Sequence, residues 1–361
     1  MSSPLTKSVF SYLDVLRLNF PKLFFKKLLT SIYSYDIILL SVRESDGNSQ
    51  QVNDRKENFI MEKFDRRRKY YVVLDCETAT LPYASDLPEN LKKQVAIAKP
   101  LIYDLGWTIV DKKGNVYARE NYLISEIFSV PSIFNTAYYA EKRPLYIDKL
   151  NKGEIVLTDW RTATARLEFA LSIGEAVGAY NAMFDFKKAI PFTELYINQL
   201  YSPNFHKWLD FQNECCERIV NKTVIGKEKE FEPDVFRFRG KSYPLFDLWG
   251  LSCEYLLNND DYKKACLLNG WQTESGKYFK TSAETTYRFI SGKVDFDEAH
   301  TAIDDADIES EIFALIVKRA KNKVEMGIEY FPFRKLGTVS RFVETCPTLD
   351  YMTRVRFLLD D

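Results

Sequence analysis

The apolar and polar positions along this chain predict strands first, then strands alternating with helices. An apolar run at residues 70–75 predicts a buried strand, and residues 101–124 predict two strands joined at the KKGN turn, residues 112–115. Apolar residues recur at helical spacing over residues 162–176 and again over residues 299–320. We therefore expect a hairpin beside the first strand and two amphipathic helices further along.

Two shorter segments each predict a strand that leads to an acidic residue at the start of a helix. Residues 176–181, AVGAYN, lead to Asp185, and residues 243–247, YPLFD, end at Asp247. Between them, residues 191–240 show a less regular pattern, which we interpret as an insertion. This order of elements is typical of an α/β protein with a mixed sheet flanked by helices.

A polar stretch divides the chain. Residues 43–58, RESDGNSQQVNDRKEN, predict a linker, so we expect an N-terminal extension at 1–60, a main domain at 61–320 and a C-terminal extension at 321–361. The N-terminal 43 residues are rich in Phe, Tyr, Leu and Lys. They predict amphipathic helices that lie on a protein partner or a membrane surface, or that pack on the main domain as a small helical appendage.

Composition narrows the function classes without selecting one. The 361 residues are 46% hydrophobic, which supplies a core, and the net charge of −1 gives no global sign of a nucleic-acid partner. Six cysteines without a C-x-x-C pair and only two histidines argue against a structural zinc site. The most apolar N-terminal stretch, residues 37–42, is too short to cross a bilayer, so we expect a soluble cytoplasmic protein with reduced thiols and no membrane span.

Residues 72–82, VVLDCETATLP, place two carboxylates at the end of an apolar strand. Alternate side chains of a strand leave on the same face, so Asp75 and Glu77 point the same way while Cys76 points toward the core. The two acids repel each other, and a divalent cation such as Mg²⁺ removes that repulsion because it prefers oxygen ligands. The alternative is that Asp75 ends the strand and Glu77 is solvated.

Three further acidic sites follow along the chain: Asp185, Asp247 and the run Asp304, Asp305 and Asp307. Together with the strand acids they form three motifs in one order, DCET at residues 75–78, NAMFD at 181–185 and HTAIDD at 300–305. This arrangement resembles the DEDDh 3′–5′ exonucleases of the ribonuclease H-like superfamily, which include polymerase proofreading subunits, ribonuclease T and oligoribonuclease. The resemblance runs from about residue 70 to residue 320 and implies a ribonuclease H-like mixed sheet.

The resemblance also implies a role for each motif residue. Four carboxylates hold two Mg²⁺ or Mn²⁺ ions and a histidine acts as general base: Asp75, Glu77, Asp185, Asp305 and His300. The five-residue spacing from the histidine selects Asp305 over its acidic neighbours, and Asp247 is expected to be structural. Four more residues are expected to contact the 3′ end of a DNA or RNA single strand: Thr78, Leu81, Asn181 and Phe184.

The chain departs from the family pattern in its first motif. The common D-x-E-T-T-G-L is DCETATL here, so Thr80 occupies the glycine position, while Leu81 keeps the place of the residue that wedges against the terminal base. Phe184 also fits a core position, Asn181 also fits a cap of its own turn, and His300 also fits a surface or helix-cap position. The residues alone leave these alternatives open.

Two functions from different classes follow. The first is a metal-dependent 3′–5′ exonuclease that acts on the 3′ end of single-stranded DNA or RNA. The second is a binding module of the same fold that docks a replication or repair partner through residues 1–60 and the region 191–240. The presence of all four motif acids and the histidine favours the enzyme.

Overall fold

The computed structural model describes residues 64–65, 67–81, 99–220, 235–321 and 331–346, without the side chains of 213–220. The expected N-terminal extension at residues 1–60 lies outside the described residues. The chain divides into two compact units, Met1–Asp65 and Arg66–Asp361.

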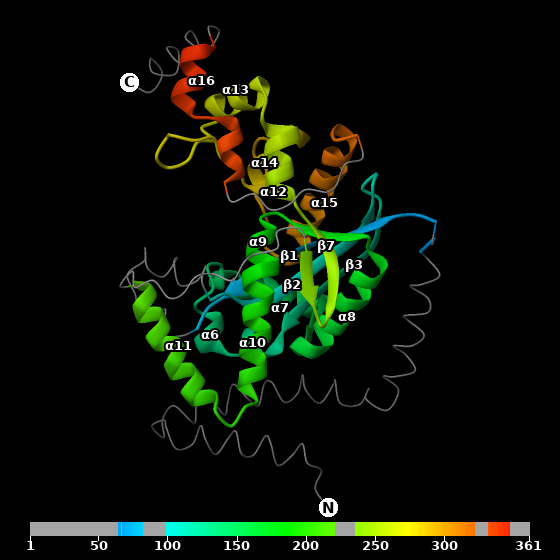
Figure 1. Ribbon diagram of the computed structural model, residues 1–361, viewed down its shortest axis with the longest axis vertical. Coiled ribbons are helices and arrows are strands. Elements are labelled where there is room, and N and C mark those ends of the chain that lie inside the picture. The colour runs from blue at the N-terminus through cyan, green and yellow to red at the C-terminus, as the bar shows by residue number, and fades with distance from the viewer. Residues whose placement is uncertain (1–63, 66, 82–98, 221–234, 322–330, 347–361) are drawn as a thin grey trace, which may run out of the picture. The chain divides into compact units, whose positions relative to one another are not determined.

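Seven strands form one mixed sheet in the order β4-β3-β2-β1-β5-β7-β6 (Figure 1). Strand β1 lies at its centre, antiparallel to β2 on one side and parallel to β5 on the other. The next neighbours are an antiparallel β3 beyond β2 and a parallel β7 beyond β5. The strands are β1 Tyr70–Ala79, β2 Leu101–Asp111, β3 Val116–Ile124, β4 Val156–Thr158, β5 Ala176–Ala179, β6 Val235–Phe238 and β7 Lys241–Asp247. The predicted α/β class with a mixed sheet is confirmed.

The predicted β2–β3 hairpin is confirmed, and its turn is built by one aspartate. The Asp111 Oδ1 accepts the backbone N–H groups of Lys113 at 2.8 Å and Asn115 at 3.1 Å. Gly114 adopts a φ of +81°, a left-handed conformation that glycine takes at low cost. The turn residues therefore determine where β2 ends and β3 begins.

The helices flank the sheet on both sides. They are α5 Ser125–Phe128, α6 Pro131–Phe134, η2 Ala140–Lys142, α7 Arg143–Lys152, α8 Trp160–Ile173, α9 Ala182–Phe184, η3 Asp185–Ala189, α10 Ile190–Leu200, α11 Phe205–Val220, α12 Leu248–Ser252, η4 Cys253–Leu257, α13 Asp260–Leu268, α14 Ala283–Ser291, α15 Ala302–Arg319, η5 Pro332–Leu336 and α16 Val339–Thr345. The two amphipathic helices expected from the spacing are α8 and α15. Among the described residues, no helix combines the length and the apolar character needed to cross a membrane.

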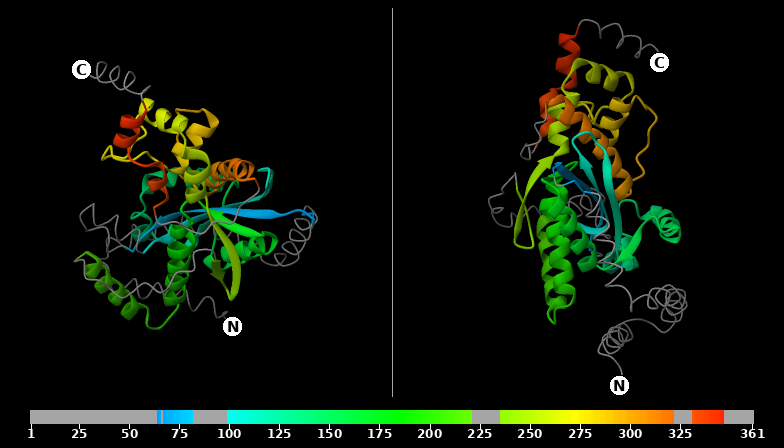
Figure 2. Two further views of the ribbon diagram at one scale, coloured as in Figure 1. Left: turned by 45° about the horizontal axis from the view of Figure 1, so that its top comes forward. Right: turned by 90° about the vertical axis from the view of Figure 1, so that its right-hand side faces the viewer.

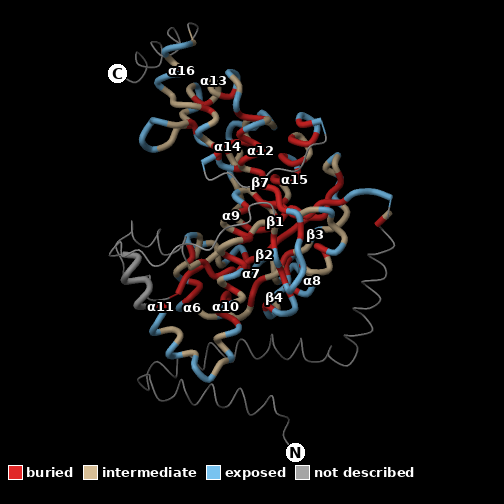
Figure 3. The backbone as a smooth tube through the Cα atoms, in the orientation of Figure 1, coloured by how far each residue is buried: buried red, intermediate tan, exposed pale blue. Residues whose placement is uncertain are grey.

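The two faces of β1 pack against different helices. Tyr71 and Val73 join the core made with Ile312 and Phe313 of α15. On the opposite face, Val72 lies against Gly174 at the end of α8. In Figure 2 (left), the yellow to red helices lie on one side of the sheet and the green helices on the other, and Figure 3 shows the buried residues concentrated along the strands. This alternation assigns Asp75 and Glu77 to the face that α15 covers.

The expected irregular region at 191–240 is corrected in its first part, which is helical. Helix α10 buries Thr193, Tyr196 and Ile197, and α11 follows it. Pro191 does not interrupt α10, because proline is tolerated in the first turn of a helix, where it stands here. Residues 221–234 of this region lie outside the described residues.

The described part of the C-terminal segment packs on the same core. Leu336 of η5 and Phe342 of α16 are buried beside residues of α15 and α12. The expected C-terminal extension therefore contributes, over residues 332–345, to the compact unit that carries the sheet.

Candidate metal centre

The C-terminal half of β1 carries the first two acids. In the β1–β2 register Asp75 pairs with Gly106 and Glu77 pairs with Asp104. Cys76 is buried, and its thiol donates a hydrogen bond to Asp185 Oδ1 at 2.9 Å. The acids of the DCET motif thus lie half-buried on one face, and the cysteine between them leaves on the other.

Helix α15 brings the third acid to this face because its first turn packs directly on β2. The backbone N–H of Ala302 donates to Asp104 Oδ2 at 2.9 Å, and Asn121 of β3 donates to the other oxygen of that carboxylate. A Cβ on Gly106 would lie 2.6 Å from the carbonyl carbon of Ala302 and from the nitrogen of Ile303. Only glycine at this position permits such a close approach, so Gly106 and Asp104 together fix the start of α15.

Three predicted residues form one compact group. One ligand atom from each of Glu77, His300 and Asp305 lies within 4.8 Å of the others. His300 lies just before α15 with a φ of +50°, and Asp305 is buried in the first turns of the helix. Among the described residues this is the only set of three acidic, histidine or cysteine side chains close enough to share a metal ion.

Asp75 and Asp185 lie beside this group but not within it. Asp185 is buried at the start of η3 and is held by the Cys76 thiol. Repulsion from Asp305, Asp185 and Glu77 adds to burial in raising the pKa of Asp75. The electrostatic coupling joins all four predicted ligands, although Asp185 also interacts with the opposite side of β1.

A fifth acid belongs here that the sequence analysis did not assign. Glu309 follows Asp305 by one helical turn on the buried face of α15 and accepts the N–H of Tyr180 at 3.2 Å. After burial, Glu309 makes the largest contribution to raising the pKa of Asp75. The i, i+4 spacing from Asp305 was the available signal. We call Asp75, Glu77, Asp185, Asp305 and Glu309 the acidic cluster.

Burial and mutual repulsion raise the pKa values of the acidic cluster. Burial, followed by the charges of Asp104 and Glu298, raises the pKa of Glu77 to about 8. Burial, followed by Glu298 and Glu77, raises the pKa of Asp305 to about 9, and burial raises that of Asp185 to about 7. Acids with such values hold protons near neutral pH unless positive charge is supplied.

One atom of the cluster also lacks a partner. Asp305 Oδ1 is buried and accepts no hydrogen bond from the described residues. A buried, unpartnered carboxylate oxygen is costly, and Glu77 and His300 lie beside it without donating a hydrogen bond to it. Oxygen-rich donor sets of this kind suit hard divalent cations, so these residues fit Mg²⁺ or Mn²⁺.

The acids near Asp305 in sequence have different roles. Arg119 forms ion pairs with Asp304 at 3.1 Å and with Asp307 at 2.6 Å, and Lys149 forms another with Asp304 at 2.5 Å. These pairs hold α15 to β3 and α7, while the side chain of Asp305 turns inward. Of the three acids in this run, Asp305 is the one that lies beside Glu77 and His300.

Asp247 is structural, as predicted. One of its oxygens accepts the N–H groups of Asn181 and Ala182 at 3.1 Å each, and the other caps α12 through Gly250. The carboxylate thereby ties the start of α9 to the end of β7. This contact positions the NAMFD motif at the end of β7.

The four residues expected to contact substrate differ in exposure. Leu81 is buried, Thr78 and Phe184 are half-buried, and Asn181 is exposed with a φ of +72°. The Asn181 side chain makes no hydrogen bond as a cap of its own turn. Thr80, in the glycine position, exchanges backbone hydrogen bonds of 2.8 Å with the hydroxyl of Thr136. These two hydrogen bonds fix the backbone at Thr80, where the family pattern has a glycine.

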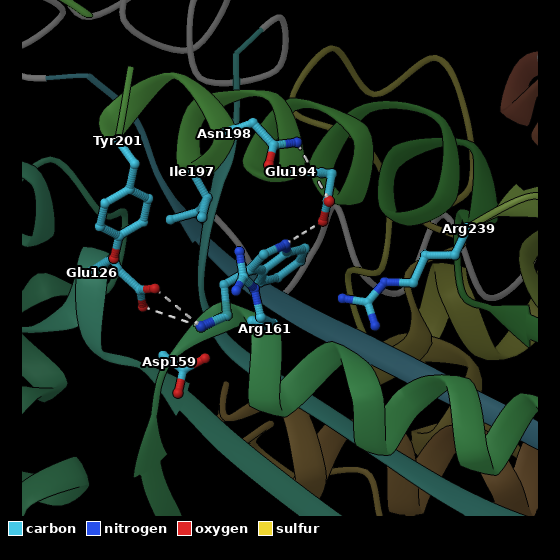
Figure 4. A pocket seen from close by; sticks show the side chains of 9 residues that line it. Glu126, Asp159, Arg161, Glu194, Ile197, Asn198, Tyr201 and Arg239 are labelled. Carbon is cyan, nitrogen blue, oxygen red and sulfur yellow. Dashed lines mark hydrogen bonds between the residues drawn. The ribbon is translucent and has the colours of Figure 1, made fainter. Parts of the chain in front are cut away.

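A separate cavity of about 320 Å³ lies between α8 and α10 (Figure 4). Glu126 and Glu194 face it, and both accept hydrogen bonds from Trp160, one from its backbone and one from its indole. None of the nine residues that line this cavity belongs to the acidic cluster. Its carboxylates are thus engaged in holding the start of α8.

Comparisons of this chain with protein-family models, with curated proteins and with solved structures find no match. The assignment of the site rests on the residues and their geometry.

Proposed function

We propose that this protein is a metal-dependent 3′–5′ exonuclease with a ribonuclease H-like fold, which hydrolyses phosphodiester bonds at the 3′ end of a DNA or RNA strand. The observation that carries the proposal is the convergence of Glu77, His300 and Asp305 within 4.8 Å of one another. Glu77 is separated from His300 and Asp305 by most of the domain in sequence, and the three residues come from two of the three motifs that resemble the DEDDh family.

The surrounding structure supports the proposal in two ways. A mixed sheet flanked by helices is the architecture that the resemblance implies, and the first motif lies on its central strand. The third motif begins where α15 docks on β2, the strand that pairs with β1. The first and third motifs therefore lie close together.

The cations would be held by Asp75, Glu77, Asp185 and Asp305. Divalent ions bound there supply Lewis-acid chemistry that activates water and neutralises charge on the leaving 3′ oxygen. Glu309 lies close enough to Asp75 and Asp305 to influence their charges, and it adds negative charge to the site. These acids carry their full charge, and hence their full affinity for cations, only when deprotonated.

His300 is suited to accept a proton from the attacking water. Burial, followed by the charge of Lys142, lowers the pKa of its imidazole below the ordinary value. The ring is thus neutral at physiological pH, as a general base must be. Its place in the compact group with Glu77 and Asp305 is also compatible with direct ligation, and the two roles differ in what loss of the ring does to metal affinity.

The test uses single-stranded DNA and RNA labelled at the 5′ end, incubated with the protein and Mg²⁺ or Mn²⁺. A ladder that shortens from the 3′ end is expected, and EDTA should abolish it. The Asp305→Asn variant is the matched control because it removes one charge at nearly constant volume. A strand that is bound but not shortened would favour the binding-module alternative, and cleavage unaffected by EDTA would exclude the metal-dependent mechanism.

A further inference from the structure

One short segment of the chain holds His300 from several directions. Residues 137–146 comprise η2 and the start of α7, and they lie far from His300 in sequence. Tyr139, Lys142 and Tyr146 of this segment each contact His300 or the residue before it. None of the three belongs to the motifs that resemble an exonuclease.

Two of these contacts hold the backbone. The Lys142 ammonium donates to the carbonyl of Ala299 at 2.8 Å, and the Tyr146 hydroxyl donates to the carbonyl of His300 at 3.3 Å. His300 needs such support because its φ of +50° is unfavourable for a residue with a side chain. The backbone is therefore fixed in a conformation that it would not keep by itself.

The third contact holds the ring. The aromatic ring of Tyr139 stacks on the imidazole with centroids 4.0 Å apart and planes inclined by 14°. The nearest acidic partner, Glu298 Oε2, is 3.7 Å from Nδ1, which is longer than a hydrogen bond. No hydrogen bond to the His300 side chain is recorded from the described residues, so the stack is the contact that sets the plane of the imidazole.

We propose that Tyr139 is a positioning residue for His300, whose ring it orients toward Glu77 and Asp305. The role in catalysis rests on the proposed function, whereas the orientation itself does not. Rotation of the imidazole about its side-chain bonds would move its nitrogens away from the carboxylates without changing the fold. A group displaced by about 1 Å loses on the order of 10²-fold in rate.

The orientation is tested first by NMR of the metal-free full-length protein with labelled histidine. The chain has two histidines, and the spectrum of His300→Ala assigns their signals. Loss of the Tyr139 ring current shifts the imidazole protons of His300 by itself, so the orientation is read from the nuclear Overhauser effects between these protons and the side chains of Glu77 and Asp305. These effects should weaken in Tyr139→Leu and persist in Tyr139→Phe. Tyr201→Leu, which removes an exposed tyrosine at the C-cap of α10 outside these contacts, is the control. Nuclear Overhauser effects that stay unchanged in Tyr139→Leu would overturn the proposal.

The catalytic consequence is tested by a double-mutant cycle. Tyr139→Leu should lower kcat about 10- to 100-fold with KM nearly unchanged, and Tyr139→Phe should restore most of the rate. In a His300→Ala background, Tyr139→Leu should lower kcat less than about threefold, because the imidazole that Tyr139 orients is already absent. Additive losses would show that Tyr139 acts independently of His300 and would overturn the positioning role. If wild type cuts no strand, the proposed function fails, and the NMR result alone decides whether Tyr139 orients the ring.

Discussion

His300 carries the most specific hypothesis about a single side chain. Its neutral imidazole stands among carboxylates, with a lowered pKa that suits a proton acceptor. The other candidate protein groups in the site are the carboxylates, which in the proposed enzyme would be engaged in holding the cations. The imidazole therefore differs in kind from every group around it.

Replacing His300 by alanine distinguishes its two possible roles. If His300 is the general base, His300→Ala should lower kcat about 10²- to 10⁴-fold and leave the affinity for Mg²⁺ little changed. Metal affinity is measured by calorimetry and kcat by strand shortening. A large loss of metal affinity would instead identify His300 as a ligand, and a wild-type rate would remove it from the mechanism.

The sequence predicts most residues of the candidate site, but it does not predict which contacts each of them makes. The spacing of the DCET motif predicts that Asp75 and Glu77 share a face, and the histidine spacing selects Asp305; the structure agrees with both. The sequence could not reveal the hydrogen bond between the Cys76 thiol and Asp185, because this contact depends on how η3 packs against β1. Glu309 lies outside the three motifs, and its four-residue spacing from Asp305 becomes informative only because α15 buries the face that carries both.

The docking of α15 on β2 depends on the absence of one side chain. Gly106→Ala places a methyl group 2.6 Å from two backbone atoms of α15, so the helix must move. We expect a loss of stability on the order of 1–3 kcal/mol, measured by denaturant unfolding, and a clear loss of Mg²⁺ affinity because Asp305 moves with the helix.

A glycine in open space provides the control for this change. Gly153 ends α7 with a φ of +70°, and no atom lies within 4 Å of the Cβ it would gain. Gly153→Ala should therefore cost about 1 kcal/mol of backbone strain without affecting metal binding. Equal metal affinity in the two variants would show that Gly106 does not position the site.

Strands and helices with a clear period were predicted well, and irregular ones were not. The β2–β3 hairpin, α8 and α15 have long apolar patterns that one period explains. The less regular pattern of residues 191–240 does not predict helix α10, which is stabilised by the tertiary packing of Tyr196 and Ile197. Strands β3 and β4 pair although several helices separate them in sequence, and the residues of the two strands do not predict this pairing.

The coupled acids make the stability of the metal-free protein depend on pH. The pKa values of Glu77, about 8, and Asp305, about 9, lie above the value of about 4 expected in the unfolded chain. The folded state therefore binds more protons, and the free energy of unfolding should fall as pH rises from about 4 toward 9. In EDTA, Tm should be lower at pH 8 than at pH 5, as measured by thermal denaturation.

Added Mg²⁺ should reverse this trend. The cation binds the ionised acids, so the increase in Tm that it causes should be larger at pH 8 than at pH 5. A Glu77→Gln, Asp305→Asn double variant should show a weaker pH dependence and little response to Mg²⁺. An equal Mg²⁺ shift at both pH values in wild type would contradict ion binding at these carboxylates.

The division of the chain into two units predicts that the second unit works by itself. Every residue of the acidic cluster lies within Arg66–Asp361, so a protein that starts at residue 66 should fold and shorten a single strand at a rate close to that of the full chain. Circular dichroism and the strand assay measure the two properties. A truncated protein that folds but does not cut would assign part of the site to the first unit.

The hydrogen bond between Asp104 and Ala302 joins positions 198 residues apart. Contacts between such distant positions form late in folding, because the loop between them must first be closed. During synthesis, a chain that has passed β7 but has not yet reached residue 300 contains every strand of the sheet but neither His300 nor Asp305. The nascent protein is consequently unable to assemble this centre, and any activity that depends on it begins only when translation of the domain is nearly complete.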